Sequence, residues 1–454
     1  MLGEAVGLQD RLFYEFCLDD RVPADHLLRR VDAVLDLSWL REELKPHYSE
    51  IGRPSVCPEL MIRMLLVGYC YSIRSERRLC QEVELNLAYR WFCRLDLEDK
   101  VPDHSTFSVN RHGRFRESDA FRLVFESVVR QCMEAGLVGG EGFAVDASVI
   151  EADASRFERI EGGETIDWTD GQLASRPVRE YLGALDSEHS PTNPERKPKA
   201  LSPSDPAAAW TIRGRNKVMF GYSLNYLIDT KEAVVVDVEA TPTRISKEVE
   251  VTGTMVERTS ERFGLEPKRI AGDVAYGTGE LLGWLAGRKI DPHIPVWDKS
   301  KRDDDTFSRG DFAFDKAGDV YVCPQGKTLK TTGKVHDGKT LLYRASKHDC
   351  NNCSLKRRCC PNTPSRKVPR DVNQAARDYA RSLMGSEAYL KSARERKKIE
   401  RLFGEAKRNL AFTRLRLRGL SGAKDEFLLT ATAQNLRRMA KYLGTGPPVV
   451  PGIA

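Results

Sequence analysis

Three acidic residues occupy positions from which carboxylates could share one reaction. Asp146 lies in the short apolar stretch Gly142–Ala147, and Asp273 ends a second apolar stretch that begins at Arg269. Glu400 lies in a segment with helical periodicity. Hard cations such as Mg²⁺ and Mn²⁺ bind oxygen ligands, and two such ions can activate an attacking hydroxyl and stabilise the leaving oxygen of a phosphodiester. Taken singly, however, an Asp after an apolar strand is more often a turn or capping residue.

The helix around Glu400 gives the acid a cationic setting. At 100° per residue, Arg396, Glu400 and Lys407 fall within an arc of about 40°. This arc lies beside an apolar stripe made of Ile399, Phe403, Ala406 and Leu410. The alternative interpretation is a surface ladder of i,i+4 ion pairs, which contributes a few tenths of a kcal/mol. If the three acids converge, the basic helix is suited to holding nucleic-acid phosphates.

The elements that must position these acids form a mixed α/β pattern. Between Gly142 and Val296 the order of strands and helices is β-β-β-α-β-α-β, typical of a three-layer α/β domain. Strands are predicted over 142–147, 219–228, 233–238, 269–273 and 290–296, and helices over 246–263 and 278–286. Asp146 and Asp273 are therefore expected at strand ends, where ligands of α/β sheets usually gather.

The rest of the chain divides around this core. Residues 1–139 read as a helical domain that we expect to bind DNA, and residues 140–442 as the α/β domain. Two insertions interrupt the latter, a polar segment over 156–210 and a longer one over 297–390. Helices are predicted over 375–383, 391–410 and 425–442, and the Pro/Gly-rich tail 443–454 is expected to be flexible.

Composition and charge narrow the class of protein. The chain has 454 residues, 41% apolar and 30% charged, with a net charge of +6. Residues 391–420 hold 11 basic and 3 acidic side chains, so this one stretch exceeds the whole net charge. No apolar run is long enough to span a membrane, and the N-terminus lacks the pattern of a secretory signal. We expect a cytoplasmic protein with reduced cysteines.

Five of the eleven cysteines cluster in the second insertion. Cys350 and Cys353 form a C-x2-C knuckle, which Cys323 precedes and Cys359 and Cys360 follow. Four thiolates suit a tetrahedral structural Zn²⁺, and Cys323, Cys350, Cys353 and Cys359 are the expected ligands. Unligated reduced thiols are the alternative, and His348 could replace one thiolate. The other six cysteines are expected in helical cores.

Further arginines are candidates for DNA contact. Arg414, Arg416 and Arg418 alternate with leucines, a period of two that predicts a strand with three guanidiniums on one side. Arg74, Arg77 and Arg78 lie on or near a helix and could read DNA, the alternative being a solvated helix face. Glu151 and Asp153 follow the first strand and are weaker candidates than Asp146 as metal ligands.

Several motifs in the same order resemble the DDE transposases of bacterial insertion sequences. Arg396, Glu400 and Lys407 match the last three positions of the family signature Y-x2-R-x3-E-x6-K, with Ala393 in place of the tyrosine. Further matches are VDASVIEADAS around Asp146, IAGDVAYGT around Asp273, PDHST at 102–106, TRLRLRGL at 413–420 and QNLRR at 434–438. The resemblance covers residues 15–442 and implies an α/β ribonuclease-H-like fold. It also implies a bacterial protein that is associated with the nucleoid when active.

The resemblance also implies a reaction. Asp146, Asp273 and Glu400 would bind two Mg²⁺ or Mn²⁺ ions, while Arg396 and Lys407 would position phosphates. Water would cut one strand at each terminal inverted repeat, and the freed 3′-OH would attack target DNA. Because two ends must be joined, a homodimer or larger assembly on double-stranded DNA is expected. The alternatives are a metal-dependent nuclease without strand transfer, and a domesticated sequence-specific DNA-binding protein without catalysis.

Overall fold

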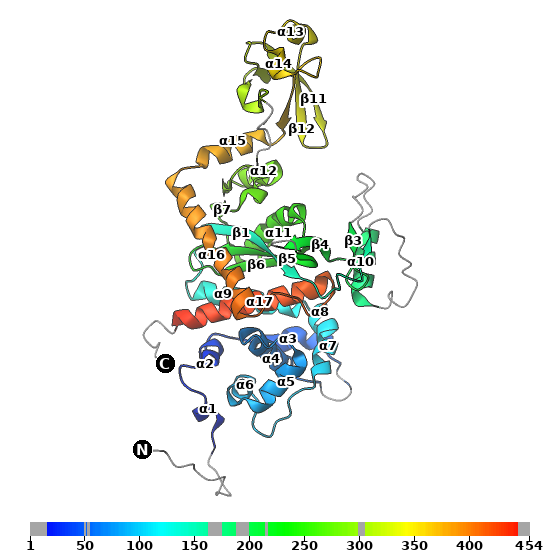
Figure 1. The fold of residues 1–454 in the computed structure, drawn as a ribbon. Coiled ribbons are helices and arrows are strands. Elements are labelled where there is room, and N and C mark those ends of the chain that lie inside the picture. The colour runs from blue at the N-terminus through cyan, green and yellow to red at the C-terminus, as the bar shows by residue number, and fades with distance from the viewer. Residues whose placement is uncertain are drawn as a thin grey trace, which may run out of the picture.

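The computed structural model describes residues 16–49, 51, 55–161, 175–187, 199–213, 217–297 and 305–443. Figure 1 shows three parts stacked along the long axis of the molecule: a helical N-terminal part, a central sheet with its helices, and a smaller β-rich part at the far end. The predicted tail lies outside the described residues after Leu443, and so do parts of both predicted insertions.

The N-terminal part is built from short helices. They are α1 (Leu18–Arg21), α2 (Leu27–Asp32), α3 (Leu40–Leu44), η1 (Lys45–His47), α4 (Pro58–Cys70), α5 (Glu76–Leu85), α6 (Leu87–Phe92), α7 (His104–His112), α8 (Arg114–Glu117) and α9 (Ala120–Glu134). Helix α4 is buried almost all round, including Arg63, whose guanidinium donates to Asp32 at 2.6 Å. Gly136, with φ +70°, follows α9 before the chain enters the sheet.

The central sheet has the strand arrangement of the ribonuclease-H-like fold. Its strands are β1 (Gly142–Glu151), β4 (Ala209–Arg213), β5 (Lys217–Asp229), β6 (Val235–Pro242), β7 (Arg269–Ala271) and β8 (Asp291–His293). The order is β4-β5-β1-β7-β8, with β6 pairing the second half of β5. Strand β1 runs antiparallel to β5 and parallel to β7, so the sheet is mixed, as the sequence predicts.

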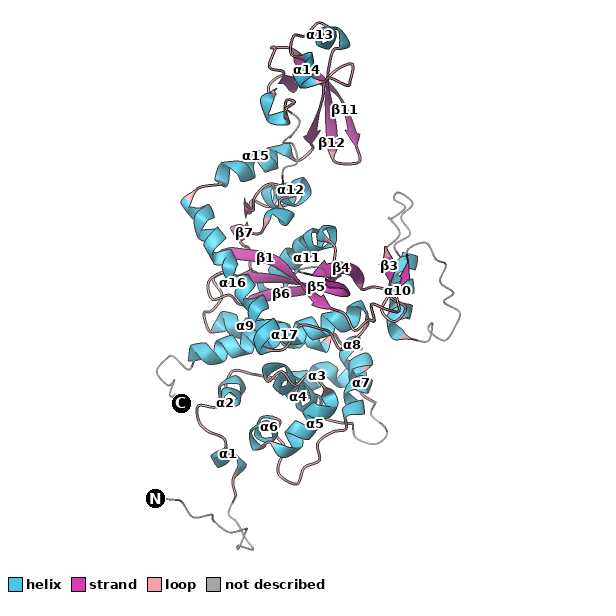
Figure 2. Ribbon diagram, viewed as in Figure 1, coloured by secondary structure: helices cyan, strands magenta, loops and turns pink. Residues whose placement is uncertain are grey.

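Helices cover both faces of this sheet. Helix α11 (Ile245–Phe263) packs on β6 and β5, while α17 (Gly419–Leu443) and α9 lie on the other side (Figure 2). Helix α16 (Glu387–Asn409) crosses β1. Helices α12 (Gly279–Gly287) and α15 (Gln374–Leu383) pack on each other beside β8. In the first insertion lie β2 (Ile160–Glu161), β3 (Ala200–Leu201) and α10 (Arg176–Ser187).

The second insertion contains a sheet of its own, which we call the inserted module (residues 305–373). Its elements are η4 (Arg309–Asp311), β9 (Ala313–Asp315), β10 (Val320–Val322), β11 (Thr328–His336), β12 (Thr340–Ala345), α13 (Lys347–Asn351), α14 (Lys356–Cys359) and β13 (Lys367–Asp371). The strand order is β13-β12-β11-β10-β9. A small separate core that includes Tyr321, Leu329, Tyr343 and Val368 holds it together.

Two local predictions are wrong. Strand β1 does not end at Ala147, because the residues from Ser148 to Glu151 also pair with the long strand β5. Asp146 therefore lies in the middle of the strand and not at its end. Residues 413–418 contain turn and bend residues and form no strand; an isolated bridge joins Arg414 to Glu151. The period of two nevertheless holds, since Leu415 is buried between the exposed Arg414 and Arg416.

Candidate active site

The register of the sheet brings the two aspartates to the same level. In the parallel pair of β1 and β7, Ala144 lies opposite Ala271. Asp146 and Asp273 each follow two residues later on neighbouring strands, so both carboxylates lie just beyond the last paired residues of β7. Asp273 also caps the short helix η3 (Val274–Tyr276), because its Oδ1 accepts the Ala275 amide at 2.8 Å.

The turn after Asp273 is fixed by a glycine. The carbonyl of Gly277 accepts the Trp297 amide at 2.9 Å. A Cβ added at Gly277 would collide with the backbone of Pro295, so only glycine allows the two chain segments to approach this closely. The turn therefore holds the start of η3, and with it Asp273, against the chain that follows β8.

Glu400 reaches the sheet because the apolar stripe of α16 packs on it. Ile399, Leu402, Phe403 and Ala406 are buried, in agreement with the predicted stripe. Phe403 stacks on Tyr226, with ring centroids 5.1 Å apart. Tyr226 is the cross-strand neighbour of Asp146, so the helix is aligned directly over the strand that carries the first acid.

A buried hydrogen-bond chain fixes this alignment. The Tyr226 hydroxyl donates to Gln434 Oε1 at 2.8 Å, and Gln434 Nε2 donates to the Leu402 carbonyl at 2.8 Å. Asn435 accepts from the Val235 amide and donates to the Val235 carbonyl. Through Gln434 and Asn435, helix α17 therefore holds β5, β6 and α16 together. These two residues belong to the QNLRR motif at 434–438, so the motif has a structural role here.

Arg396 lies between two of the three acids. Its guanidinium is 3.4 Å from Asp146 Oδ2 and 3.1 Å from Glu400 Oε1. One cation therefore joins a carboxylate of β1 to a carboxylate of α16. Among the described residues, no three His, Cys, Asp or Glu side chains are grouped as metal ligands would be. In this arrangement the Arg396 guanidinium supplies the positive charge that lies between the carboxylates of Asp146 and Glu400.

The electrostatics indicate that the acids share one environment. The pKa of Asp146 is raised to about 6, mainly by burial and also by the negative charges of Asp273 and Glu400, against the opposing effects of the Ala147 amide and Arg396. A cation near such a carboxyl group would stabilise its ionised form and lower its pKa.

Two further groups belong to this site and were missed from the sequence. The half-buried Glu248, in the first turn of α11, accepts the Ser223 hydroxyl at 2.6 Å, and its pKa is raised by burial and by Asp273. Tyr276 is buried, its hydroxyl has no hydrogen-bond partner among the described residues, and its pKa is raised by burial and by Asp146, Glu248 and Asp273. The sequence offers only a weak signal for Glu248, an acidic residue in a first helical turn.

Two models of known families match segments of the chain. A model described as "Transposase domain (DUF772)" matches residues 16–113, and a model described as "Transposase DDE domain" matches residues 322–440. The second match includes Glu400, the inserted module from Val322 onward and most of α17. The chain is a DDE transposase.

A solved structure titled "Cryo-EM structure of piggyBac transposase synaptic complex with hairpin DNA (SNHP)" is also similar to this transposase. The sequences are 10% identical, the match covers 94% of this chain and 86% of the other, and the TM-score is 0.31. At that score the structural likeness carries no argument about details. Asp146 and Asp273 lie between the two family matches.

The predicted DNA-binding residues of the transposase lie in different settings. Lys407 contacts the Ser148 hydroxyl on β1, beside the acids. Arg414 and Arg418 both pair with Asp153, at 3.1 and 3.0 Å. Arg416 is exposed and lines a cavity of about 290 Å³ between the helical part and α17. Asp153 is thus an ion-pair partner of these arginines.

The arginines of the helical part also differ from one another. Arg74 is buried in an ion pair with Glu426 of α17, and its guanidinium lies over the Phe412 ring at 4.5 Å. It is therefore a docking residue rather than a reader of DNA. Arg77 and Arg78 are exposed on α5, so the DNA-contact interpretation stays open for them.

The five clustered cysteines of the transposase line one cavity of about 30 Å³ in the inserted module. Burial and the neighbouring thiols of Cys360 and Cys323 raise the pKa of Cys350. The Cys323 sulfur accepts the Lys327 amide at 3.3 Å in a turn that contains Gly326. His348, the alternative ligand, does not line this cavity. None of the described cysteines is in a disulfide.

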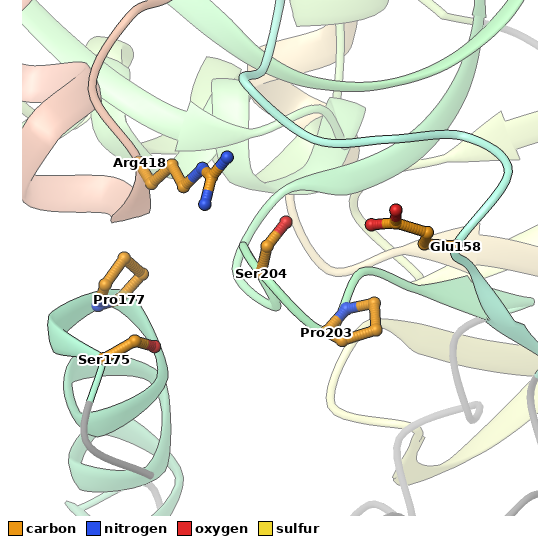
Figure 3. A pocket seen from close by; sticks show the side chains of 6 residues that line it. All are labelled: Glu158, Ser175, Pro177, Pro203, Ser204 and Arg418. Carbon is orange, nitrogen blue, oxygen red and sulfur yellow. The ribbon is translucent and has the colours of Figure 1, made fainter. Parts of the chain in front are cut away.

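A larger cavity, of about 400 Å³, lies away from the acids. Figure 3 shows Arg418 on one side of it and Glu158 on the other. Its remaining lining residues are Ser175, Pro177, Pro203 and Ser204. None of the three catalytic candidates lines this cavity, so its size does not make it the active site. No described helix is long and apolar enough to cross a membrane.

Proposed function

We propose that Asp146, Asp273 and Glu400 are the catalytic carboxylates of this transposase, and that it cuts DNA at the element's ends and joins the 3′-OH to target DNA. The observation that carries the proposal is the relative position of the three acids. Asp146 and Asp273 share a level of the sheet, and Arg396 links Asp146 to Glu400. Three separated sequence segments meet here, which neither a turn residue nor a surface ion-pair ladder requires.

The donor set fits hard divalent cations. The acids supply oxygen ligands, and the Arg396 guanidinium already pairs with the carboxylates of Asp146 and Glu400. Asp146, Asp273 and Glu400 would hold Mg²⁺ or Mn²⁺, with Glu248 as an additional acid beside Asp273. When bound, two such ions would stabilise the attacking and leaving oxygens of an in-line phosphodiester displacement.

The protein's own residues would orient the DNA. Arg396 would exchange its carboxylate partners for a phosphate, since guanidinium binds both in a planar, bidentate manner. Lys407, on the same helical face and in contact with β1, would hold a second phosphate. The exposed cations of α16, which include Arg394, Lys397 and Arg401, would extend this contact along the backbone. Because two element ends must be brought together, we expect at least a dimer on DNA.

Replacing Glu400 by Gln is the first test of this function. The change keeps the shape of the side chain and removes its charge. We expect both strand cutting and strand transfer to fall by at least about 10²-fold, because the removal of even an outer-shell partner of a metal costs about 10–100-fold. The measurement maps 3′ ends and joined products on a plasmid that carries the gene with its native flanks, in Mg²⁺ and with EDTA as a further control.

Glu405→Gln is the matched control on the same helix, because Glu405 faces Arg437 at 3.7 Å rather than the acids. Cutting that survives in the Glu400 variant at the wild-type rate would refute the assignment. Cut ends without joined products in the wild type would favour the nuclease alternative. Tight binding of the wild type to the repeats without any cutting would favour the DNA-binding alternative.

We also propose that the inserted module binds one structural zinc ion. Cys323, Cys350, Cys353 and either Cys359 or Cys360 would supply four thiolates, since all five line the same cavity. The module buries only a small core, which gives it little stability. A bound metal ion would stabilise its folded state further. Four protein ligands leave no open position, so the role would be structural.

Metal analysis of the purified protein tests the zinc proposal. We expect about one zinc per chain in the wild type and a much lower content in Cys353→Ser, because three thiolates bind zinc more weakly than four. Cys80→Ser, in α5 and outside the module, should keep full zinc content. A wild-type protein that carries no zinc and resists a chelator without change in melting temperature would contradict the proposal.

A further inference from the structure

The sheet of the inserted module has two unlike faces. One face carries the module's core, with Leu329, Tyr343 and Val368 buried on β11, β12 and β13. Because side chains alternate along a strand, the residues next to these point to the other face. They are Lys330, Arg344 and Lys367, and all three are exposed.

The strand register aligns these cations in one row. Lys330 lies opposite Arg344 in the pair of β11 and β12, and Arg344 lies opposite Lys367 in the pair of β12 and β13. Neighbouring strands are about 4.8 Å apart, so the row is about 10 Å long. We call it the basic row. It crosses the strands at right angles, and Thr328 and Thr332 stand exposed on the same face, two residues from Lys330 along β11.

The basic row has no counter-charge within the described part of the chain. No hydrogen bond or ion pair joins the side chain of Lys330, Arg344 or Lys367 to another described residue. By contrast, Arg370 of β13 lies over the Phe314 ring at 3.6 Å, and Lys339, just before β12, pairs with Glu280 at 2.9 Å. The module as a whole holds 14 Lys and Arg against 7 Asp and Glu, so its surroundings do not neutralise the row.

Neither solubility nor edge protection explains the row. Lysines on edge strands discourage sheet-to-sheet aggregation. Of the three strands that carry the row, however, only β13 is an edge strand, and β12 and β11 lie in the interior of the sheet. Like charges directly opposite each other are destabilising in a sheet. A row of three such charges across interior strands therefore opposes the stability of a small module, and an external polyanion would remove that repulsion.

We propose that the basic row binds the phosphate backbone of DNA, which extends the contact of the transposase well beyond its acids. The row offers point charges and hydroxyls but no groove or pocket for base edges, so the contact would be independent of sequence. Figure 1 shows the module projecting from the central sheet beyond α12 and α15, where it would meet a part of the duplex distant from Glu400. The inference rests on the proposed function only in taking DNA as the ligand.

The salt dependence of DNA binding tests the basic row. Full-length wild type is compared with Lys330→Gln, Arg344→Gln, Lys367→Gln and the triple variant, on a labelled duplex of about 40 base pairs of unrelated sequence. Removing one phosphate contact should reduce the slope of log Kd against log salt by about 0.9, and the triple variant should reduce it by about 2 to 3. Lys316→Gln, which removes an exposed cation in the β9–β10 turn of the same sheet, should leave the slope unchanged.

The possible results decide the matter separately from catalysis. A triple variant with the wild-type melting temperature and the wild-type salt slope would overturn the inference. If the triple variant melts early, the three single variants carry the test, since each exposed change should leave the fold intact. Glu400→Gln should keep the full salt slope of DNA binding. Failure of the catalytic proposal would appear as unimpaired cutting in Glu400→Gln, whereas failure of the basic-row proposal would appear as an unchanged slope in the triple variant.

Discussion

Replacing Asp146 by Asn should abolish strand cutting and at the same time stabilise the DNA-free, metal-free transposase. The pKa of Asp146 is raised from 3.8 to about 6, mainly by burial, so its ionised form is unfavourable in the folded state. A shift of this size corresponds to about 3 kcal/mol, as an order of magnitude. Catalysis and stability therefore oppose each other at this residue, as expected where acids are gathered for a cation.

The sign of the pH dependence follows from the raised pKa. Below pH 4 the carboxyl is protonated in both folded and unfolded chains and carries no penalty. Between pH 4 and 6 the unfolded chain releases the proton first, so this residue lowers the stability of the wild type as pH rises, and the penalty is complete above pH 6. The Asn variant lacks this loss. Thermal denaturation in EDTA at pH 5 and pH 8 measures the difference, which should be larger at pH 8.

Asp205→Asn provides the matched control. Asp205 is also buried, its pKa is also raised to about 6 mainly by burial, and its Oδ1 accepts the Tyr222 hydroxyl at 2.5 Å. It does not belong to the acid site. Its variant should gain stability in the same pH range and keep cutting DNA. An Asp146→Asn variant that cuts DNA like the wild type would remove Asp146 from the reaction.

Replacing Arg74 by Met should destabilise the transposase by about 3–5 kcal/mol, because it leaves the buried Glu426 without its cation. The Arg74 and Glu426 side chains are 8% and 2% exposed. Glu426 also accepts the Arg416 and Leu417 amides, at 2.6 and 2.7 Å, so the strain would reach the segment that precedes α17. Denaturant unfolding, followed by tryptophan fluorescence, measures the loss.

Two comparisons interpret this result. Arg77→Met removes an exposed arginine from the neighbouring helix and should change stability by less than about 0.5 kcal/mol. The double variant Arg74→Met with Glu426→Gln should recover part of the loss, since it removes the uncompensated charge. If Arg74→Met instead weakened DNA binding without affecting unfolding, Arg74 would be a DNA contact rather than a docking residue.

Periodicity predicts the central sheet and the helix α16 well. The stripe through Ile399 and Phe403 identifies the buried face of α16, and that face sets the direction of Glu400. The apolar stretches that precede Asp146 and Asp273 predict two strands, because buried parallel strands need continuous apolar residues. What the motifs do not give is the register, and it is the pairing of Ala144 with Ala271 that brings the two aspartates level.

The remainder depends on contacts between distant segments. Nothing local distinguishes Glu248 from other acids in a first helical turn, and only the fold brings it beside Asp273. Arg414 and Arg418 alternate like strand residues, but their partner is Asp153 rather than a neighbouring strand. The polar composition of residues 305–373 hides a sheet whose core is small, with a row of cations on its other face.

The binding of Mn²⁺ at the three acids tests the central claim most directly. Crystals of the transposase would be grown with Mn²⁺, and the metal located by its anomalous scattering. We expect a peak between Asp146, Asp273 and Glu400, with the Arg396 guanidinium turned away from both of its present carboxylate partners. Absence of a peak at millimolar Mn²⁺, with Arg396 still joining Asp146 to Glu400, would contradict the assignment of these acids as the catalytic metal ligands.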